Sequence, residues 1–338
     1  MNWLSNSYPL PIAAIVVGSI ILALLGAFFG LLYRGIDRKL AAHMQGRIGP
    51  PIIQPFRDVR KLLVKESIIP EGGVSWLFQA CPFIGLVTST LLLIYIPVFG
   101  PGALLEGYGD LILILYLLIV PSLVLVVGGF ASSSPFATVG AQREMVIMMS
   151  YEFPLAVAII AIAWRTGYVT DANPFIFSTI AQYPIWNQVG PVGVVGALTL
   201  LFTLLVVTPG EVAKVPFDIA EAETEIAGGL LVEYSGRNLA LFYLADIIKA
   251  FAMVSLIVAL FFPYNISPVI GIGPTAPAVA VDALFFLLKV FLVMFFSVTL
   301  IRTAMARFKI SQASYIYIIA MTLIGLVGLL LIHVDMLL

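Results

Sequence analysis

Long apolar stretches alternate with short polar ones along this chain and predict eight membrane-spanning helices. A run of about 20 apolar residues is long enough to cross the hydrocarbon core of a bilayer as a helix. The chain has no evident internal repeat and no Pro/Ser/Gly linker, so we expect an all-α polytopic membrane protein whose residues 1–338 form a single integral membrane domain. The predicted spans are residues 10–33, 76–98, 110–130, 144–164, 190–208, 239–262, 280–301 and 313–334.

The polar loops differ sharply in their content of Lys and Arg. The loops at 34–75, 131–144, 210–238 and 302–312 carry eight, one, two and three of these cations, whereas the opposite loops carry only Arg165. Cytoplasmic loops of membrane proteins are enriched in Lys and Arg. We therefore expect a multi-pass protein of the cell (cytoplasmic) membrane with both termini on the outer side. No Lys or Arg precedes Arg34, so the amino-terminal stretch lacks the basic region of a signal peptide.

The composition narrows the chemistry that the chain can perform alone. The chain is 61% hydrophobic and 10% charged, and its net charge of −1 argues against a nucleic-acid-binding surface. Cys81 is the single cysteine, and His43 and His333 are far apart, so neither a disulfide framework nor a zinc or iron–sulfur site is expected. We expect no cofactor bound by this chain, with any redox centre held by a partner.

One polar stretch, residues 209–238, is unusually acidic for a segment between two spans. It holds a third of the protein's 18 carboxylates, namely Glu211, Asp218, Glu221, Glu223, Glu225 and Glu233. Asp218, Glu221 and Glu225 would form one stripe if the chain after Pro216 is helical, because residues spaced i, i+3 and i+7 share a helix face. Carboxylates crowded together raise each other's pKa towards neutrality. The stretch is therefore a candidate ion path at the membrane boundary.

Charged residues inside the predicted spans are further candidates for that path. Glu152 lies about 12 Å beyond Glu144 along one helix, and an intramembrane carboxylate is a functional candidate by default. For Glu144 the alternative is a helix cap that pairs with Arg143. Asp246 and Lys249 are three residues apart and could form a structural ion pair or a step in the path.

Three more charged residues lie in or near the last two spans. Lys289 falls near the middle of a span and needs a partner from another helix. Asp282 and Asp335 lie near the outer face, and we expect them to be solvated.

The first basic loop, residues 34–75, carries more cations than topology requires. Within it, residues 56–64 place cations and apolar side chains at helical spacing, which predicts a surface-lying amphipathic helix. Such a helix could contact anionic lipid headgroups or a soluble protein, and the turn residues around Gly49 and Pro50 favour the protein. With Arg143 from the next basic loop, the candidate docking residues are Arg34, Arg38, Lys39, Arg47, Arg57, Arg60 and Lys61.

Three motifs resemble those of a known family. DRKLAAHMQGRIGPP with QPFRDVRKLLVKE, then GAQREMVIMMSYE, then PFDIAEAETEIAGGLLVEYSG occur in the order found in the membrane subunit that joins the two arms of respiratory complex I. Only three residues separate Gly49-Pro50 from Gln54-Pro55, where the quinone-reducing members carry more. The chain is therefore most similar to the equivalent subunit of Ech- and Mbh-type energy-converting membrane-bound [NiFe] hydrogenases.

The resemblance implies a non-catalytic, ion-translocating subunit that couples ferredoxin oxidation and proton reduction in a multi-subunit hydrogenase to H⁺ or Na⁺ transport. It implies NiFe and iron–sulfur centres in partner subunits, docking of a soluble arm on loops 34–75 and 209–238, and soluble hydrogenase-like large and small subunits, antiporter-like membrane subunits and lipid as partners. The expected ion path comprises Glu144, Glu152, Asp218, Glu221, Glu223, Glu225 and Glu233, which match the family motifs, together with Asp246, Lys249 and Lys289.

Two alternatives remain open. The first is the quinone-site membrane subunit of a complex I-like NADH or other dehydrogenase. The second is a stand-alone secondary transporter, which predicts an inverted repeat and helices broken at matching positions in two halves. Neither feature is evident in the sequence.

Overall fold

The computed structural model describes residues 12–99, 102–271 and 276–338, and over these ranges every long element is a helix. Eight helical segments are long and apolar enough to cross a membrane, which confirms the predicted number. They are Ala13–Met44, Ser75–Tyr95, Leu111–Ala131, Pro135–Val169, Pro191–Glu211, Gly236–Phe261, Pro277–Ala304 and Ile310–Leu337. Residues 10 and 11 of the first predicted span lie outside the described residues.

Two spans are longer than the apolar pattern indicated. Helix α1 (Ile12–Met44) continues eleven residues past the predicted end at 33, and α5 (Pro135–Val169) starts nine residues before the predicted start at 144. In both cases the extra turns carry polar residues, which a hydropathy pattern assigns to a loop. These extensions matter because they carry Arg34, Asp37, Arg38 and Arg143 on rigid helix instead of loop.

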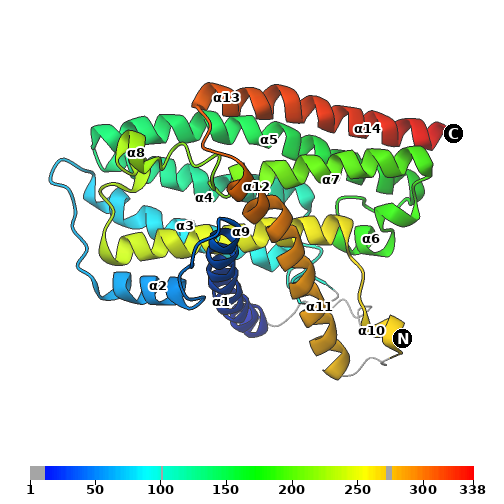
Figure 1. Cartoon of the computed structure of the whole chain (residues 1–338). Coiled ribbons are helices and arrows are strands. Elements are labelled where there is room, and N and C mark those ends of the chain that lie inside the picture. Colours follow the sequence, from blue (N-terminus) through cyan, green and yellow to red (C-terminus); the bar gives the residue numbers. More distant parts are fainter. Residues whose placement is uncertain (1–11, 100–101, 272–275) are drawn as a thin grey trace.

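Six of the spans lie in two layers (Figure 1). Helices α5, α7 (Pro191–Glu211) and α14 (Thr322–Leu337) lie side by side in the first layer. The second layer consists of α3 (Ser75–Tyr95), α4 (Leu111–Ala131) and α9 (Gly236–Phe261).

Helices α1 and α11 (Ala276–Met294) run across these layers at a steep angle. A π-helical segment, Phe295–Thr299, joins α11 to α12 (Leu300–Ala304), and a second one, Ile316–Met321, joins α13 (Ile310–Tyr315) to α14.

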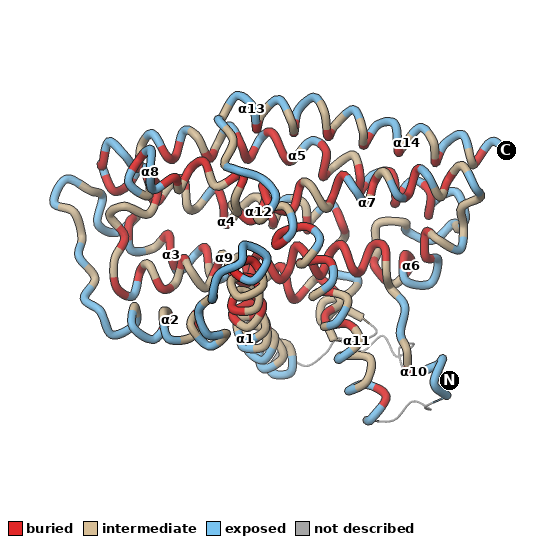
Figure 2. The backbone as a smooth tube through the Cα atoms, viewed as in Figure 1, coloured by how far each residue is buried: buried red, intermediate tan, exposed pale blue. Residues whose placement is uncertain are grey.

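Helix α9 is the most buried span. Of its most apolar window, 89% is buried inside the protein, against 17% for α1 and 28% for the last two spans. Figure 2 shows the same contrast, with α9 largely buried and one side of α14 exposed. A helix that is apolar on all sides can be buried in protein or can face lipid, and the burial of α9 shows that protein surrounds it. The ionisable residues on α9 are therefore held in the middle of the bundle.

The short helices lie in the connecting segments. Helix α2 (Gln54–Val64) confirms the predicted amphipathic helix, and it buries Pro55 and Val59 against α1 and α9. Helix α6 (Phe177–Gln182) and a 3-10 turn (Ile185–Asn187) precede α7, and α10 (Ser267–Ile270) precedes α11. Protein covers only part of the apolar surface of α2, so its cationic residues and the exposed Leu63 and Val64 are all free to contact another surface.

The acidic stretch is not the helix that the spacing of its carboxylates suggested. Within residues 212–235 the only helical segments are α8 (Glu223–Ile226) and a 3-10 turn (Gly229–Leu231). The segment instead lies close against α5, where a Cβ added at Gly140 would be 3.0 Å from the Ala220 carbonyl oxygen. The predicted Asp218–Glu221–Glu225 stripe is therefore wrong, because tertiary packing holds these residues in an irregular path.

Candidate functional site

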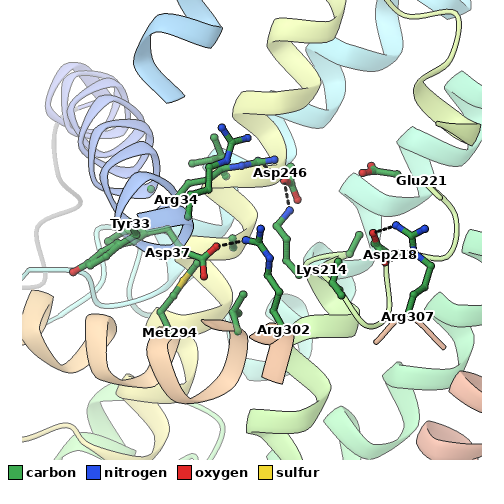
Figure 3. A pocket seen from close by; sticks show the side chains of 18 of the residues that line it. Tyr33, Arg34, Asp37, Lys214, Asp218, Glu221, Asp246, Met294, Arg302 and Arg307 are labelled. Atoms are coloured by element: carbon green, nitrogen blue, oxygen red, sulfur yellow. Dashed lines mark hydrogen bonds and ion pairs between the residues drawn. The ribbon is translucent and has the colours of Figure 1, made fainter. Parts of the chain in front are cut away.

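A cavity of about 440 Å³ lies between α1, α9, the α11–α12 region and the segment after α7. We call it the charged cavity, because ten of the residues that line it carry ionisable groups. The cations are Arg34, Arg38, Lys214, Arg302 and Arg307, and the acids are Asp37, Asp218, Glu221, Glu223 and Asp246. Figure 3 shows most of these side chains converging from elements that are far apart in the sequence.

Asp246 of α9 is held between two cations in this cavity. Its Oδ2 atom lies 2.9 Å from Arg34 Nη1 on α1 and 2.8 Å from Lys214 Nζ (Figure 3). Lys214 reaches this position because α7 ends at Glu211 and the chain reverses at Ala213, which adopts a φ of 46°. Of the two alternatives left open for Asp246 and Lys249, the ion pair between them is not observed, because each pairs with residues of other elements.

Two further ion pairs fix other walls of the charged cavity. Asp37 of α1 accepts from Arg302 Nη1 at 2.6 Å and from the Thr299 hydroxyl at 2.7 Å. Thr299 closes the first π-helical segment, a kind of irregularity that is frequent at functional sites. Asp218 accepts two hydrogen bonds from Arg307. Nε donates to Oδ1 at 2.8 Å, and Nη2 donates to Oδ2 at 2.6 Å. This fork geometry holds the acidic stretch to the loop before α13.

A second, smaller cavity of about 80 Å³ continues from the charged cavity into the bundle. It is lined by Glu144, Glu211 and Lys249, which are 5%, 3% and 4% exposed. Lys249 Nζ lies 2.7 Å from Glu211 Oε1 and donates to the Ser122 hydroxyl at 2.6 Å. Glu144 lies well inside α5, so the alternative in which it caps a helix is wrong.

Glu221 joins the two cavities, since it lines both of them together with Arg34, Ala213 and Asp246. Burial and, to a smaller extent, the nearby Asp246 carboxylate raise the pKa of Glu221 to about 7 against the opposing effects of Lys214 and Arg34. A carboxyl group with a pKa near neutrality can both take up and release a proton at physiological pH. Glu221 is thus placed and tuned for proton exchange between the two cavities.

The remaining predicted path residues of the acidic stretch and of α5 lie in several different places. Glu223 lines the charged cavity, and Glu225 is exposed and paired with Arg143 at 2.6 Å. Glu152 is partly buried on α5, and its Oε1 atom has no hydrogen-bond partner among the described residues. Glu233 is partly buried outside both cavities.

The predicted docking cations divide into two groups. Arg34, Arg38 and Arg143 are engaged inside the protein, with Asp246, Asp58 and Glu225. Lys39 is partly buried, whereas the remaining four are exposed on or before α2: Arg47, Arg57, Arg60 and Lys61. These four are the ones free to meet another surface.

Charged residues at the opposite end of the bundle have different partners. Lys289 Nζ donates to the carbonyl oxygens of Phe262 and Tyr264, both at 2.8 Å, so its partner is the end of α9 instead of an acid. Asp335 accepts from the backbone N–H groups of Gly190 and Gly193 and its side chain is only 5% exposed. The expectation that Asp335 is solvated is therefore wrong.

Asp282 likewise makes three hydrogen bonds, from the backbone N–H groups of Ile266 and Ser267 and from the Ser267 hydroxyl. Asp282 is still partly exposed, so these protein donors add to its contact with solvent and do not contradict the expectation that it is solvated. Lys289 lines neither the charged cavity nor the small one, so the structure does not bring it together with the other predicted path residues.

Sequence reasoning missed several residues of this site. Glu211 belongs to the acidic stretch but not to the predicted path, although a carboxylate directly after the apolar run to Gly210 is a signal of burial at a span end. Asp37, Lys214, Arg302 and Arg307 were missed because their partners are 32 to 265 residues away in the chain. No spacing rule links such positions.

The arrangement can pass charge by proton exchange. Across the described ranges, no group of three or more His, Cys, Asp or Glu side chains is arranged to hold a metal ion. Ionisable or hydroxyl side chains line the route from the charged cavity through Glu221 and Asp246 to the Glu211–Lys249 pair and Ser122.

Comparisons with known proteins identify similar chains. Residues 16–333 match the family model described as NADH dehydrogenase. The chain is 34% identical to Hydrogenase-4 component C of Escherichia coli over 235 residues, which is 69% of this chain and 71% of that one. It is 34% identical to a subunit of the NADH-quinone oxidoreductase of Bacillus cereus over 289 residues, which is 82% of each chain.

A solved structure is also similar. It is that of the membrane-bound sulfane sulfur reductase, an archaeal respiratory membrane complex, with a TM-score of 0.80 and 27% sequence identity. The match covers 94% of this chain and 99% of that one. The likeness therefore extends over nearly the whole bundle.

Proposed function

The chain belongs to the NADH dehydrogenase family and is a multi-pass membrane subunit of a complex I-like respiratory complex, and we propose that it is the ion-conducting and docking subunit of an energy-converting hydrogenase. In this role it couples ferredoxin oxidation and proton reduction in a soluble arm to H⁺ or Na⁺ movement through the membrane arm. The chain itself performs no redox chemistry in this proposal.

One observation carries the proposal, namely the unbroken series of ionisable side chains from the charged cavity into the bundle. Glu221 and Asp246 border both cavities, and Glu211 and Lys249 form an ion pair deep within the second. A buried ion pair is weak evidence for stability, because desolvation opposes the attraction between the charges. Buried, paired charges that line connected cavities are instead typical of an ion pathway through a membrane protein.

The lining of the charged cavity favours the hydrogenase branch over a quinone site. Sites for apolar ligands are mostly lined by hydrophobic and aromatic side chains, whereas ten ionisable residues surround this cavity. The similarity to Hydrogenase-4 component C agrees with that branch. A quinone-site subunit is the second candidate, because the NADH-quinone oxidoreductase relative is similar over 82% of the chain. Neighbouring reading frames distinguish the two: hydrogenase large and small subunits support the first, and a full set of NADH-oxidising subunits overturns it.

The proposal assigns the redox centres and the remaining subunits to partners. NiFe and iron–sulfur centres belong to soluble hydrogenase-like large and small subunits, and antiporter-like subunits adjoin the chain in the membrane. Arg57, Arg60 and Lys61 on the exposed side of α2 suit an acidic surface of the soluble arm, since the helix is already attached to the bundle through the buried Val59. The charged cavity would then face the junction between the arms.

The experiment that tests the ion path uses Glu211→Gln in the complete complex reconstituted into lipid vesicles. We expect a lower yield of complex, because Lys249 is left buried without its anion. In the complex that does assemble, we expect normal electron transfer in detergent but loss of ion uptake coupled to electron transfer, because the neutral amide cannot carry the exchanged proton. The matched control is Asp110→Asn at the outer end, where Asp110 caps α4 through Leu113 N–H and Asn is an equally good cap. Coupled uptake at the wild-type rate in Glu211→Gln would refute the path.

A further inference from the structure

A cavity of about 280 Å³ lies at the end of the bundle opposite the charged cavity, and we call it the outer cavity. Among the described residues, its walls are Pro97, Gly102 and Glu106, helix α6, the end of α9 and helix α11. Unlike the charged cavity, it contains only two ionisable residues, Glu106 and Lys289, set among polar and aromatic side chains such as Gln182 and Phe286. It therefore presents one positive and one negative group.

The positive group is held in a fixed place. Lys289 donates two hydrogen bonds to the last carbonyls around the end of α9. An ammonium group has three N–H donors, so one donor is left for a ligand in the cavity. The attachment of the other two to backbone holds this charge in place, and Nζ also lies 4.9 Å from the centre of the Phe285 ring.

The negative group, Glu106, has one carboxylate oxygen that lacks a hydrogen-bond donor among the described residues. This atom, Oε1, is buried. Buried carboxylate oxygens are normally hydrogen-bonded. A ligand that supplies an N–H donor at this point would satisfy it.

An apolar groove of about 260 Å³ leads away from the outer cavity between α7 and α11. The two share Phe262 and Lys289, and the groove continues along Leu201, Leu205, Leu292 and Phe296. Leu292 and Phe296 are 45% and 54% exposed, so the groove is open along its side. Leu201 lies ten residues into α7, about 15 Å along the helix, which matches the thickness of one leaflet of the hydrocarbon core.

From these features we infer that the outer cavity and the apolar groove bind one phospholipid whose headgroup carries a primary amine beside its phosphate. The phosphate accepts from Lys289, the amine donates to Glu106, and one acyl chain lies in the groove. An anionic headgroup such as that of phosphatidylglycerol offers hydroxyl donors but no positive charge, and its net negative charge is repelled by Glu106. A quaternary amine has no N–H to give, so the pair of side chains selects a headgroup of the phosphatidylethanolamine type.

This assignment separates Lys289 from the predicted ion path and gives it a role in lipid recognition. It does not depend on the proposed ion transport, because the outer cavity shares no lining residue with the charged cavity or the small one.

The test measures lipid binding to the purified, delipidated complex by native mass spectrometry, with phosphatidylethanolamine, phosphatidylcholine and phosphatidylglycerol as probes. We expect the wild-type complex to bind phosphatidylethanolamine most tightly. Lys289→Met should weaken that binding about tenfold or more, because it removes a charge-assisted hydrogen bond, while Lys289→Arg retains it. Glu106→Gln should keep the binding of phosphate-bearing lipids but lose the preference for the primary amine.

Two further measurements keep the inference open to refutation if Lys289→Met weakens the end of α9. Leu205→Trp fills the groove without touching the headgroup cavity and should also reduce binding. In the intact complex, Leu292→Cys should remain reactive towards lipid-soluble thiol reagents. Equal binding of the three lipids by the wild-type complex would overturn the inference. Efficient cross-linking of the Leu292→Cys variant to a neighbouring membrane subunit would also overturn it, because it would show that protein fills the groove.

Discussion

The carboxylates at the two ends of the bundle are held in different ways. At the inner end, Asp246 and Asp218 meet Arg and Lys side chains across cavities. At the outer end, Asp335 and Asp282 accept mainly from backbone N–H groups, and Asp335 also lies 3.7 Å from Arg165 Nη2. Backbone donors are fixed by the helices that carry them, whereas long cationic side chains can change rotamer and partner.

The difference teaches how one protein can use the same chemical group for two purposes. An acid held by backbone amides positions two helices and has little reason to release its partners. A carboxylate that is paired with cationic side chains beside a cavity can change partners when a proton or another ion enters that cavity. We therefore expect substitutions at the inner end to change transport, and substitutions at the outer end to change assembly.

The largest effect is expected from Lys249→Met. This change leaves Glu211 buried without its cation, and removing one partner of a buried ion pair costs about 3–5 kcal/mol. The yield of assembled complex and its thermal stability should fall, and coupled transport should be lost. The double variant Glu211→Gln with Lys249→Met should regain assembly but not transport. If transport returned in the double variant, the comparison between the two ends would fail.

An intermediate effect is expected from Gly193→Ala at the outer end. A Cβ at this position would lie 2.5 Å from Asp335 Oδ2, so α7 and α14 must separate, at a cost of about 1–3 kcal/mol. The melting temperature of the complex should fall while the ratio of ions moved per electron stays normal. Gly85→Ala is the matched control, because its nearest neighbour in the structure would be 3.6 Å away. A changed ion-to-electron ratio in Gly193→Ala would contradict the assignment of this end to assembly.

The smallest effect, and the most specific, is expected from Glu221→Gln. The pKa of Glu221 is raised from 4.5 to about 7, so wild-type stability falls as pH rises between these values, because the unfolded chain releases its proton first. The Gln variant has no such loss. Its melting temperature relative to wild type should therefore increase from pH 5 to pH 8, whereas Glu221→Asp should keep the wild-type pH dependence. A constant difference between Gln variant and wild type would refute the raised pKa.

The sequence predicted the eight spans well, because each is a local run of apolar residues and needs no knowledge of its neighbours. It predicted the acidic stretch as a region but not its conformation. Helical spacing at Asp218, Glu221 and Glu225 indicated a stripe, yet Asp218 is drawn to Arg307 and Glu221 to the space beside Asp246. The pairing of distant residues depends on how the helices pack, and packing has no local signature.

The same reasoning explains the error at Asp335 and why Asp246 and Lys249 do not pair with each other. A carboxylate near the carboxyl terminus is usually exposed, but here α14 ends beside the start of α7, whose N–H groups need acceptors. Residues three apart on a helix often interact, but α9 is surrounded by other spans, which offer nearer partners on both sides.

The walls of the charged cavity have a consequence for how the protein is made. They come from α1 near the start of the chain, from the segment after α7, and from Arg302 and Arg307 near its end. A ribosome must therefore release more than nine-tenths of the chain before the last wall exists. A product arrested after its sixth span would insert into the membrane and bury much of its apolar surface, yet Asp37 and Asp218 would remain without their arginines. Completion of the junction is thus a late event in biosynthesis, and a truncated chain would not offer a finished surface to the soluble arm.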